Sequence, residues 1–350
     1  MTNRRSPRTE HLNATHVVSD VIPLPAPPEA GPAGGEGGWL WDLSRAATGS
    51  DRYELLGQIA RGGMSVLFLA RDRILGRRVA VKILRDDLYP CPAVERRFLR
   101  EARVSAQLQH PGIAPLYDVG RMPDGRPFLV MRYVDGRTLE DLLAARRSPA
   151  EDLPLFLDVF TQVARAVAYA HAKGVVHRDL KPLNVIVSPG GVACLLDWGL
   201  AKVLGEGPGP PWGADGPAGP DDDSGLSGRV VGGAGQTAGM GTVGTPAYIA
   251  PEQARARTAG AVDERADVFG LGGILCDVLT GAPPFTGEPA DVWRKARRGD
   301  VADAHARLAG CGGPHGVVAL ARRCLAARPA DRPRTGGDVL RAIAPLVTVG

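Results

Sequence analysis

Several features that would assign this chain of 350 residues to other protein classes are scarce or missing. No run of about 18 apolar residues predicts a membrane span, and no apolar segment follows the N-terminal arginines to make a signal peptide. The formal net charge is only +4, with arginines spread along the chain, which does not indicate nucleic-acid binding. We therefore expect a cytoplasmic protein with no nucleic-acid and no membrane partner.

Cysteine is also scarce, and its placement excludes two kinds of site. The five cysteines are irregularly spaced; none forms a C-x-x-C pair or lies near a histidine at metal-ligand spacing. An odd, irregular set does not indicate a disulfide framework or a zinc site. We expect free thiols in a reducing compartment, at Cys91, Cys194, Cys276, Cys311 and Cys324.

Apolar residues make up 44% of the chain, enough for a proper core. Residues 1–50 are not expected to contribute to this core, because they are rich in Pro, Gly, Ala and Ser and show no helical or strand period. We expect a disordered tail there, because such a segment cannot bury enough apolar area to offset its ordering entropy. Trp39 and Trp41 within it are expected to dock on the folded part, since exposed tryptophans are unfavourable.

From Tyr53 onward the apolar pattern predicts a small β-rich unit followed by a mostly helical one. One helix in the first unit is expected over 93–108, with Val94, Phe98, Ala102, Ser105 and Leu108 on one stripe. The clearest helix of the second unit covers 155–174 and ends at Gly174. The predicted strands cover 53–60, 65–71, 78–84, 114–119 and 127–133.

The string HRDLKPLNVIVSPGGVACLLDWG, residues 177–199, carries the most chemistry. Asp179 offers an acid for a hydroxyl proton, and Lys181 a cation for a phosphate. Asn184 and Asp197, thirteen residues apart, offer an amide and a carboxylate for a metal ion. Phosphoryl transfer from a metal-bound nucleotide needs this combination of groups.

A second motif places Lys82 amid apolar residues in VAVKIL. A lysine in a buried strand is costly unless it is paired. Glu101, 19 residues later in RFLREA, is the expected partner, and Glu95 is a less favoured alternative. Without such a partner, Lys82 would be an edge lysine whose ammonium group reaches the solvent.

Together with GTPAYIAPE (244–252), these strings resemble the motifs of protein kinases, and the chain resembles a bacterial, eukaryotic-like Ser/Thr protein kinase. The resemblance implies an α+β, two-lobed fold over residues 53–346. A small antiparallel sheet with one main helix would form the N-lobe (53–134), and a larger, mostly helical C-lobe would follow (135–346). A Gly/Pro-rich insert at 205–240 would interrupt the activation loop; whether it is passive or regulatory stays open.

The resemblance also implies ATP and Mg²⁺ as cofactors and a role for each residue. Asp179 would accept the substrate proton, and Lys181 would neutralise charge on the γ-phosphate. Asn184 and Asp197 would hold Mg²⁺, while Lys82 with Glu101 would hold the α- and β-phosphates. The remaining nucleotide contacts would come from Ile59, Gly62, Gly63, Leu67, Ala80, Met131, Arg132 and Val134.

Three departures from the family pattern stand out. Ala60 and Ser65 replace two glycines of the G-x-G-x-x-G hairpin, and Trp198 replaces the phenylalanine that follows the metal-binding aspartate. We expect Trp198 to pack against the regulatory helix as phenylalanine does. Arg132 stands where the family often has glutamate; the expected contacts there are backbone ones, so the change should matter little.

Other positions carry regulatory or structural expectations. Arg178 beside the catalytic aspartate is expected to need a phosphorylated loop residue as its counter-anion; Thr242 is favoured and Thr237 is the second candidate. Thr245 matches the substrate-site threonine. The structural expectations are an ion pair between Glu252 and Arg332, and anchoring by Asp267 of HRDLKPLN (177–184), which matches the catalytic loop of the family.

The expected function is transfer of the ATP γ-phosphate to Ser or Thr hydroxyls of proteins, including the chain itself. The main alternative is a pseudokinase or scaffold that binds nucleotide with weak or no turnover. The replacement of two hairpin glycines by Ala60 and Ser65 favours this alternative. A small-molecule kinase of the same broad architecture is a further alternative, but such enzymes lack the GTPAYIAPE platform. An interaction module built on the tail and insert alone is the weakest reading.

Overall fold

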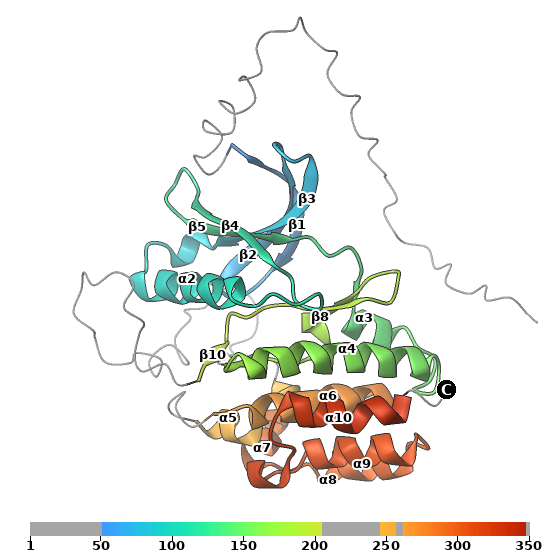
Figure 1. Cartoon of the computed structure of the whole chain (residues 1–350). Coiled ribbons are helices and arrows are strands. Elements are labelled where there is room, and N and C mark those ends of the chain that lie inside the picture. The colour runs from blue at the N-terminus through green and yellow to red at the C-terminus, as the bar shows by residue number, and fades with distance from the viewer. Residues whose placement is uncertain (1–50, 205–245, 257–261, 348–350) are drawn as a thin grey trace, which may run out of the picture. The chain divides into compact units, whose positions relative to one another are not determined.

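A five-stranded antiparallel sheet forms first along the chain, as the apolar alternation predicts. The computed structural model describes residues 51–204, 246–256 and 262–347, and these lie in one compact unit, residues 46–350. The strand order is β1-β2-β3-β5-β4 (Figure 1). The strands are β1 (Tyr53–Arg61), β2 (Ser65–Asp72), β3 (Arg77–Leu84), β4 (Leu116–Arg121) and β5 (Pro127–Arg132).

Helix α2 (Pro92–Ala106) packs on one face of this sheet (Figure 1). Pro92 suits its first turn, because the amide that proline lacks would have no helical acceptor there. Val94, Phe98 and Ala102 form the expected buried stripe against Leu84 and Leu129 of the sheet. The helix ends two residues earlier than expected, and Leu108 is buried beyond it.

The helical part that follows is built around α4 (Leu153–Ala172) and α6 (Arg265–Thr280). Gly174, with φ 71°, adopts the left-handed conformation that ends α4, as the sequence predicts. The remaining helices are α3 (Leu139–Ala144), α5 (Pro251–Arg255), α7 (Pro289–Arg298), α8 (Ala302–Gly310), α9 (His315–Cys324) and α10 (Gly336–Val347). The expected two-lobed α+β fold is confirmed.

Short strands follow the large sheet along the chain, and four of them, β7 to β10, lie within or close to residues 177–199. They are β6 (Arg137–Thr138), β7 (Val175–Val176), β8 (Val185–Val187), β9 (Ala193–Leu195) and β10 (Lys202–Val203). The short 3₁₀ turns are η1 (Asp86–Leu88), η2 (Pro182–Asn184), η4 (Pro246–Tyr248) and η6 (Pro329–Asp331).

The loop after α2 is hydrogen-bonded to β9. Ile113 and Leu195 form a parallel bridge, and Leu195 N–H donates to Gly112 O at 2.8 Å. This connection ties the helix that carries Glu101 to the strand that leads into Asp197. Residues 112–113 therefore help to set the distance between those two carboxylates.

Helix α6 is buried on all sides, which is typical of a helix at the centre of a large core. Gly270 lets it approach the catalytic loop closely: a Cβ built there would lie 2.8 Å from the Cβ of Leu180. Real Cβ atoms do not come that close, so only glycine fits at this position without displacement of the loop.

Among the described residues, α4 alone is long and apolar enough to cross a membrane by length and composition. Of its apolar window, 56% is buried inside the fold. Phe160 and Val163 on this helix belong to the same core cluster as Phe269 of α6. The packing of α4 in the core therefore explains its length and apolar composition.

The five cysteines all lie in the described part of the chain, and all are free thiols. Cys194, Cys276 and Cys324 are buried, whereas Cys91 and Cys311 are partly exposed. The expectation of free thiols is confirmed.

Candidate active site

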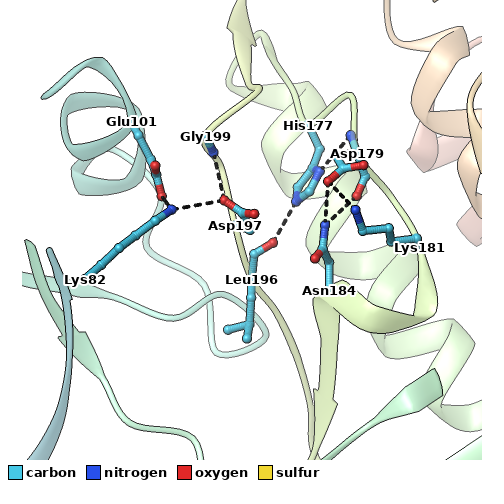
Figure 2. A network of polar contacts seen from close by, with 9 residues as sticks. All are labelled: Lys82, Glu101, His177, Asp179, Lys181, Asn184, Leu196, Asp197 and Gly199. Carbon is cyan, nitrogen blue, oxygen red and sulfur yellow. Dashed lines mark hydrogen bonds and ion pairs between the residues drawn. The ribbon is translucent and has the colours of Figure 1, made fainter. Parts of the chain in front are cut away.

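Lys82 joins three elements at the centre of the site (Figure 2). Its Nζ donates to Glu101 Oε1 on α2 at 2.5 Å and to Asp197 Oδ1 beyond β9 at 3.2 Å. Burial opposes the charge of Lys82, but the carboxylates of Asp197 and Glu101 raise its pKa above the ordinary value. Lys82 in turn lowers the pKa of Asp197 to about 2, so that carboxylate is ionised at neutral pH.

The pairing with Glu101 is the expected one. Glu95, the alternative partner, instead forms an ion pair with Arg121 of β4, so that alternative is wrong. The Glu101 side chain is only 4% exposed, and its Oε2 has no hydrogen-bond partner among the described residues. Gly199 lets the Glu101 and Asp197 carboxylates lie close to the backbone at position 199. A Cβ there would lie 3.0 Å from Glu101 Oε2 and 3.1 Å from Asp197 Oδ1.

Asp179, Lys181 and Asn184 form a second cluster (Figure 2). Asp179 Oδ2 accepts from Lys181 Nζ at 2.8 Å and from Asn184 Nδ2 at 3.0 Å. Asn184 Nδ2 also donates to Asp179 O at 2.8 Å. The Asn184 amide is thereby oriented, and neither its Oδ1 nor Asp179 Oδ1 has a partner among the described residues.

Asp267 of α6 anchors the backbone of the catalytic loop, as expected. Its carboxylate accepts the N–H groups of His177 and Arg178, each at 2.7 Å, and the Nε2 of His171 at 2.9 Å. Gly336 N–H donates to Nδ1 of His171, which leaves the proton on Nε2 to donate to Asp267. Although burial opposes it, this set of donors lowers the pKa of Asp267.

His177 and Trp198 link the catalytic loop to the metal motif. His177 Nε2 donates to Leu196 O at 2.9 Å (Figure 2), and its Nδ1 accepts from Asp179 N–H at 3.2 Å. The Trp198 ring meets the His177 ring edge to face, with centroids 4.6 Å apart. Trp198 is buried in the large core cluster, to which Val104 of α2 also belongs, and its Nε1 lacks a partner among the described residues. Its packing against α2 stays a prediction.

Two residues of this site hold unusual backbone angles. Arg178 and Asp197 have φ of 68° and 61°, and among the described residues only Asp152 is a third non-glycine with positive φ. Such angles persist where the surroundings over-determine them, and they concentrate at functional sites. Arg178 is held by Asp267 on its N–H, while its C=O accepts from Gln253 Nε2 at 2.9 Å.

The strand register brings four of the expected nucleotide contacts to one face of the sheet. Leu67 is paired with Lys82 across β2 and β3, and Ala80 with Met131 across β3 and β5. Cross-strand partners and alternate residues share a face, so these four lie on the face that carries α2. Ile59 falls at an irregularity between β1 and β2 and is 47% exposed.

The expected base contacts from the backbone of residues 132–134 stay a prediction. The backbone N–H of Arg132 donates to Pro115 O at 3.1 Å, so a contact from Arg132 would have to use its C=O. Among the described residues, the N–H groups of Tyr133 and Val134 have no acceptor. The Arg132 side chain also has a role that the sequence did not suggest: its Nη2 donates to Pro111 O at 3.2 Å and contacts Cys194 Sγ at 3.4 Å.

Of the remaining expectations, one concerns an ion pair that the structure describes, and the others concern residues outside the described ranges. Arg332 binds Glu252 through two parallel hydrogen bonds of 2.6 and 2.9 Å, as predicted. Thr237, Thr242 and Thr245, together with the tail 1–50 and the insert 205–240, lie outside the described residues.

Sequence reasoning missed Arg85, Gln253 and Gly270, which support the site at three different places. The available signals were weak: an Arg-x-Asp triplet after a strand, a polar residue directly after GTPAYIAPE, and a glycine within a helical pattern. Each of these is common in sequences, and its partner is distant along the chain.

Comparison with known proteins agrees with this geometry. The protein kinase domain model matches residues 53–336. "Serine/threonine-protein kinase PknB" of Mycobacterium tuberculosis is 38% identical over 294 residues, which cover 83% of this chain and 42% of that protein. PknB of Mycolicibacterium smegmatis is 37% identical over 300 residues, with the same two coverages.

A relative from Streptomyces coelicolor, "Probable serine/threonine-protein kinase SCO3848", is 38% identical over 240 residues, or 68% of this chain and 31% of that protein. The chain thus spans less than half the length of the curated relatives it matches. The family match covers most of the chain and includes both polar clusters of the site, and on these grounds the chain belongs to the protein kinase domain family.

Proposed function

We propose that this chain is an active Ser/Thr protein kinase that transfers the γ-phosphate of ATP to Ser and Thr hydroxyls of proteins. One observation carries the proposal: the Asp179 carboxylate is held by Lys181 and Asn184, while Asp197 is joined to the Lys82–Glu101 pair. The names of the three relatives, two Ser/Thr protein kinases and one probable Ser/Thr protein kinase, support the same activity.

Asp179 is the group that receives or orients the hydroxyl proton. Its Oδ2 is already bonded to Lys181 and Asn184, whereas its Oδ1 has no partner among the described residues. A substrate hydroxyl would therefore meet Oδ1, the end of the carboxylate that can still accept a hydrogen bond. Lys181, already beside this carboxylate, supplies positive charge where negative charge gathers on the transferred group.

Lys82 supplies the cation for the nucleotide phosphates. Because Glu101 and Asp197 keep it protonated, its ammonium group is charged at neutral pH. Glu101 also orients Lys82 and is itself fixed by burial on α2. The position of α2 therefore controls the phosphate contact.

The oxygen atoms at the site suit Mg²⁺, a hard cation. Asn184 Oδ1 and Asp197 Oδ2 have no hydrogen-bond partners among the described residues, and Asp197 is ionised. The described residues hold no cluster of three or more His, Cys, Asp or Glu side chains at metal-binding distance. Mg²⁺ commonly binds through one or two carboxylates plus substrate phosphates, and there it neutralises phosphate charge.

Regulation by a phosphorylated loop residue is part of the proposal. Burial and then Arg178 and Arg100 lower the pKa of Lys202 on β10, whereas Asp263 and Glu264 raise it, so these three cations lie within electrostatic reach of one another. A phosphate on Thr242, or secondarily on Thr237, would be the counter-anion for Arg178 among them. Autophosphorylation would supply it. Thr242→Ala should then lower activity more than Thr237→Ala does; unchanged turnover of a dephosphorylated sample would contradict this part.

The test is phosphate transfer by the purified chain. Incubation with Mg·ATP and a generic basic protein should place phosphate on Ser and Thr residues, mapped by mass spectrometry, and EDTA should stop it. ATP binding without transfer would favour a nucleotide-binding scaffold instead. The cytoplasmic location expected from the sequence stays a prediction, which fractionation of the cells that make the protein would test.

A further inference from the structure

Arg85 contacts the glycine hairpin at three points. It directly follows β3, and its guanidinium Nη1 donates to Gly63 O at 3.0 Å and to Gly62 O at 3.4 Å. Its backbone N–H donates to Met64 O at 3.0 Å. Three successive carbonyl groups of the turn between β1 and β2 therefore bind one residue that lies outside it.

Asp87 fixes the guanidinium that makes these contacts. Arg85 Nε donates to Asp87 Oδ1 at 2.8 Å, and Nη2 donates to Asp87 Oδ2. A planar guanidinium bound through two parallel hydrogen bonds has little freedom to rotate. The remaining nitrogen, Nη1, is thereby directed at the carbonyl groups of the hairpin.

These contacts also set the direction of two amides. A trans peptide points its C=O and its N–H to opposite sides. With the carbonyls of Gly62 and Gly63 bound to Arg85, the N–H groups of Gly63 and Met64 point away from it. Neither N–H has an acceptor among the described residues, whereas Gly62 N–H is used within the turn by Ser65 O at 2.8 Å.

The turn's own hydrogen bond, from Gly62 N–H to Ser65 O, leaves the Gly62 and Gly63 carbonyls to Arg85. Gly62 and Gly63 are both exposed, and glycine is the residue with the most backbone freedom. A short exposed turn keeps its peptides in one orientation only if something binds them. Resting on the proposed kinase function, we propose that Arg85, held by Asp87, is a positioning residue that keeps the Gly63 and Met64 amides ready for the nucleotide phosphates.

The chain offers a matched control in Arg126. Its Nε donates to Asp124 Oδ2 at 2.7 Å and its Nη1 to Leu84 O at 3.2 Å, an arrangement like that of Arg85. The side chains of Arg85 and Arg126 are 20% and 24% exposed. Leu84 lies in β3 and not in the hairpin. Arg126→Ala therefore removes a similar set of arginine hydrogen bonds but leaves the Gly63 and Met64 amides in place.

The experiment compares wild type with Arg85→Ala, Asp87→Asn and Arg126→Ala. Arg85→Ala should raise the KM for ATP about tenfold and leave kcat at saturating ATP nearly unchanged. Asp87→Asn should give a smaller rise, and Arg126→Ala none. The KM of Arg85→Lys should lie between those of wild type and Arg85→Ala, because one ammonium group cannot bind the hairpin carbonyls and both oxygens of Asp87 at once.

A binding assay separates positioning from a general structural role. Arg85→Ala should weaken ATP binding but not adenosine binding, because adenosine has no phosphates to meet the amides. An unchanged KM for ATP, or equal loss of ATP and adenosine affinity, would overturn the proposal. If wild type bound ATP no better than adenosine and transferred no phosphate, the proposed function would fail and this inference with it.

Discussion

The backbone N–H of Arg178 donates to Oδ1 of Asp267 at 2.7 Å, across 89 positions of sequence. Arg178 needs this support, since its φ of 68° is unfavourable for a residue with a side chain by about 1–2 kcal/mol. Gln253 holds the other side of the same residue through its C=O. The loop that carries Asp179 therefore derives its geometry from α5 and α6.

Asp267→Asn should therefore destabilise the fold and slow catalysis. The carboxylate accepts from three donors, and an amide side chain would place one of its own donors against one of them. We expect a loss of about 2–4 kcal/mol in the free energy of unfolding, measured with urea. The exposed Asp303→Asn should leave the urea midpoint nearly unchanged; an equally small effect at Asp267 would contradict the anchoring role.

Gly270→Ala should weaken the protein although alanine is the better helix former. The added Cβ would lie 2.8 Å from Leu180 Cβ and 3.2 Å from Leu180 O. The overlap should outweigh the helix propensity gain of about 1 kcal/mol, with a net loss of about 1–2 kcal/mol and a lower kcat. Gly310→Ala is the control, because a Cβ there meets nothing within 4 Å. A Gly270→Ala protein as stable and active as wild type would refute the close contact.

The comparison of sequence with structure shows where local patterns suffice. The strand alternation after Tyr53 and the glycine after α4 are local signals, and the predicted elements there match within two or three residues. The pairing of Lys82 with Glu101 could also be predicted from the sequence, because a buried lysine needs a nearby carboxylate.

The contacts that sequence reasoning missed have no local signal. Arg85 meets Gly63 across 22 positions, and Arg132 meets Cys194 across 62. An arginine can reach many carbonyl groups, so its partner depends on how the strands pair. The N–H of Arg132 likewise has a partner that local sequence does not indicate, since it donates to Pro115 O in the folded chain.

Ionisation of Asp197 should persist in acid. Lys82 lowers its pKa from the ordinary 3.8 to about 2. Because the folded value lies below the unfolded one, this group stabilises the fold above about pH 4, and that contribution is lost as the pH falls toward 2. A loss of activity between pH 4 and 6 must then come from other groups.

Carbon-13 NMR of labelled aspartate can follow this titration. Lys82→Met should raise the Asp197 pKa toward its ordinary value, because the main cause of the shift is then removed. A wild-type midpoint at or above 3.8 would contradict the Lys82–Asp197 interaction.

Arg132→Glu tests a departure from the family pattern. The change removes the Nη2 hydrogen bond to Pro111 O and places a carboxylate near that carbonyl. We expect a loss of about 1–2 kcal/mol in stability by thermal unfolding. The KM for ATP should stay within about threefold, since the base contacts that we expect there would come from backbone groups. A rise beyond about tenfold would show that the Arg132 side chain itself contributes to nucleotide binding.

The rate of phosphate incorporation by Asp179→Asn tests the central claim most directly. Asparagine keeps the shape of the side chain but cannot take the hydroxyl proton. We predict an initial rate reduced by a factor of about 10²–10⁴, with ATP affinity and thermal stability close to wild type. Asp331→Asn, at an exposed aspartate whose ion pair with Arg328 spans 3.9 Å, should be fully active. Incorporation by Asp179→Asn at a rate within about tenfold of wild type would contradict the assignment of Asp179, and with it the proposed mechanism.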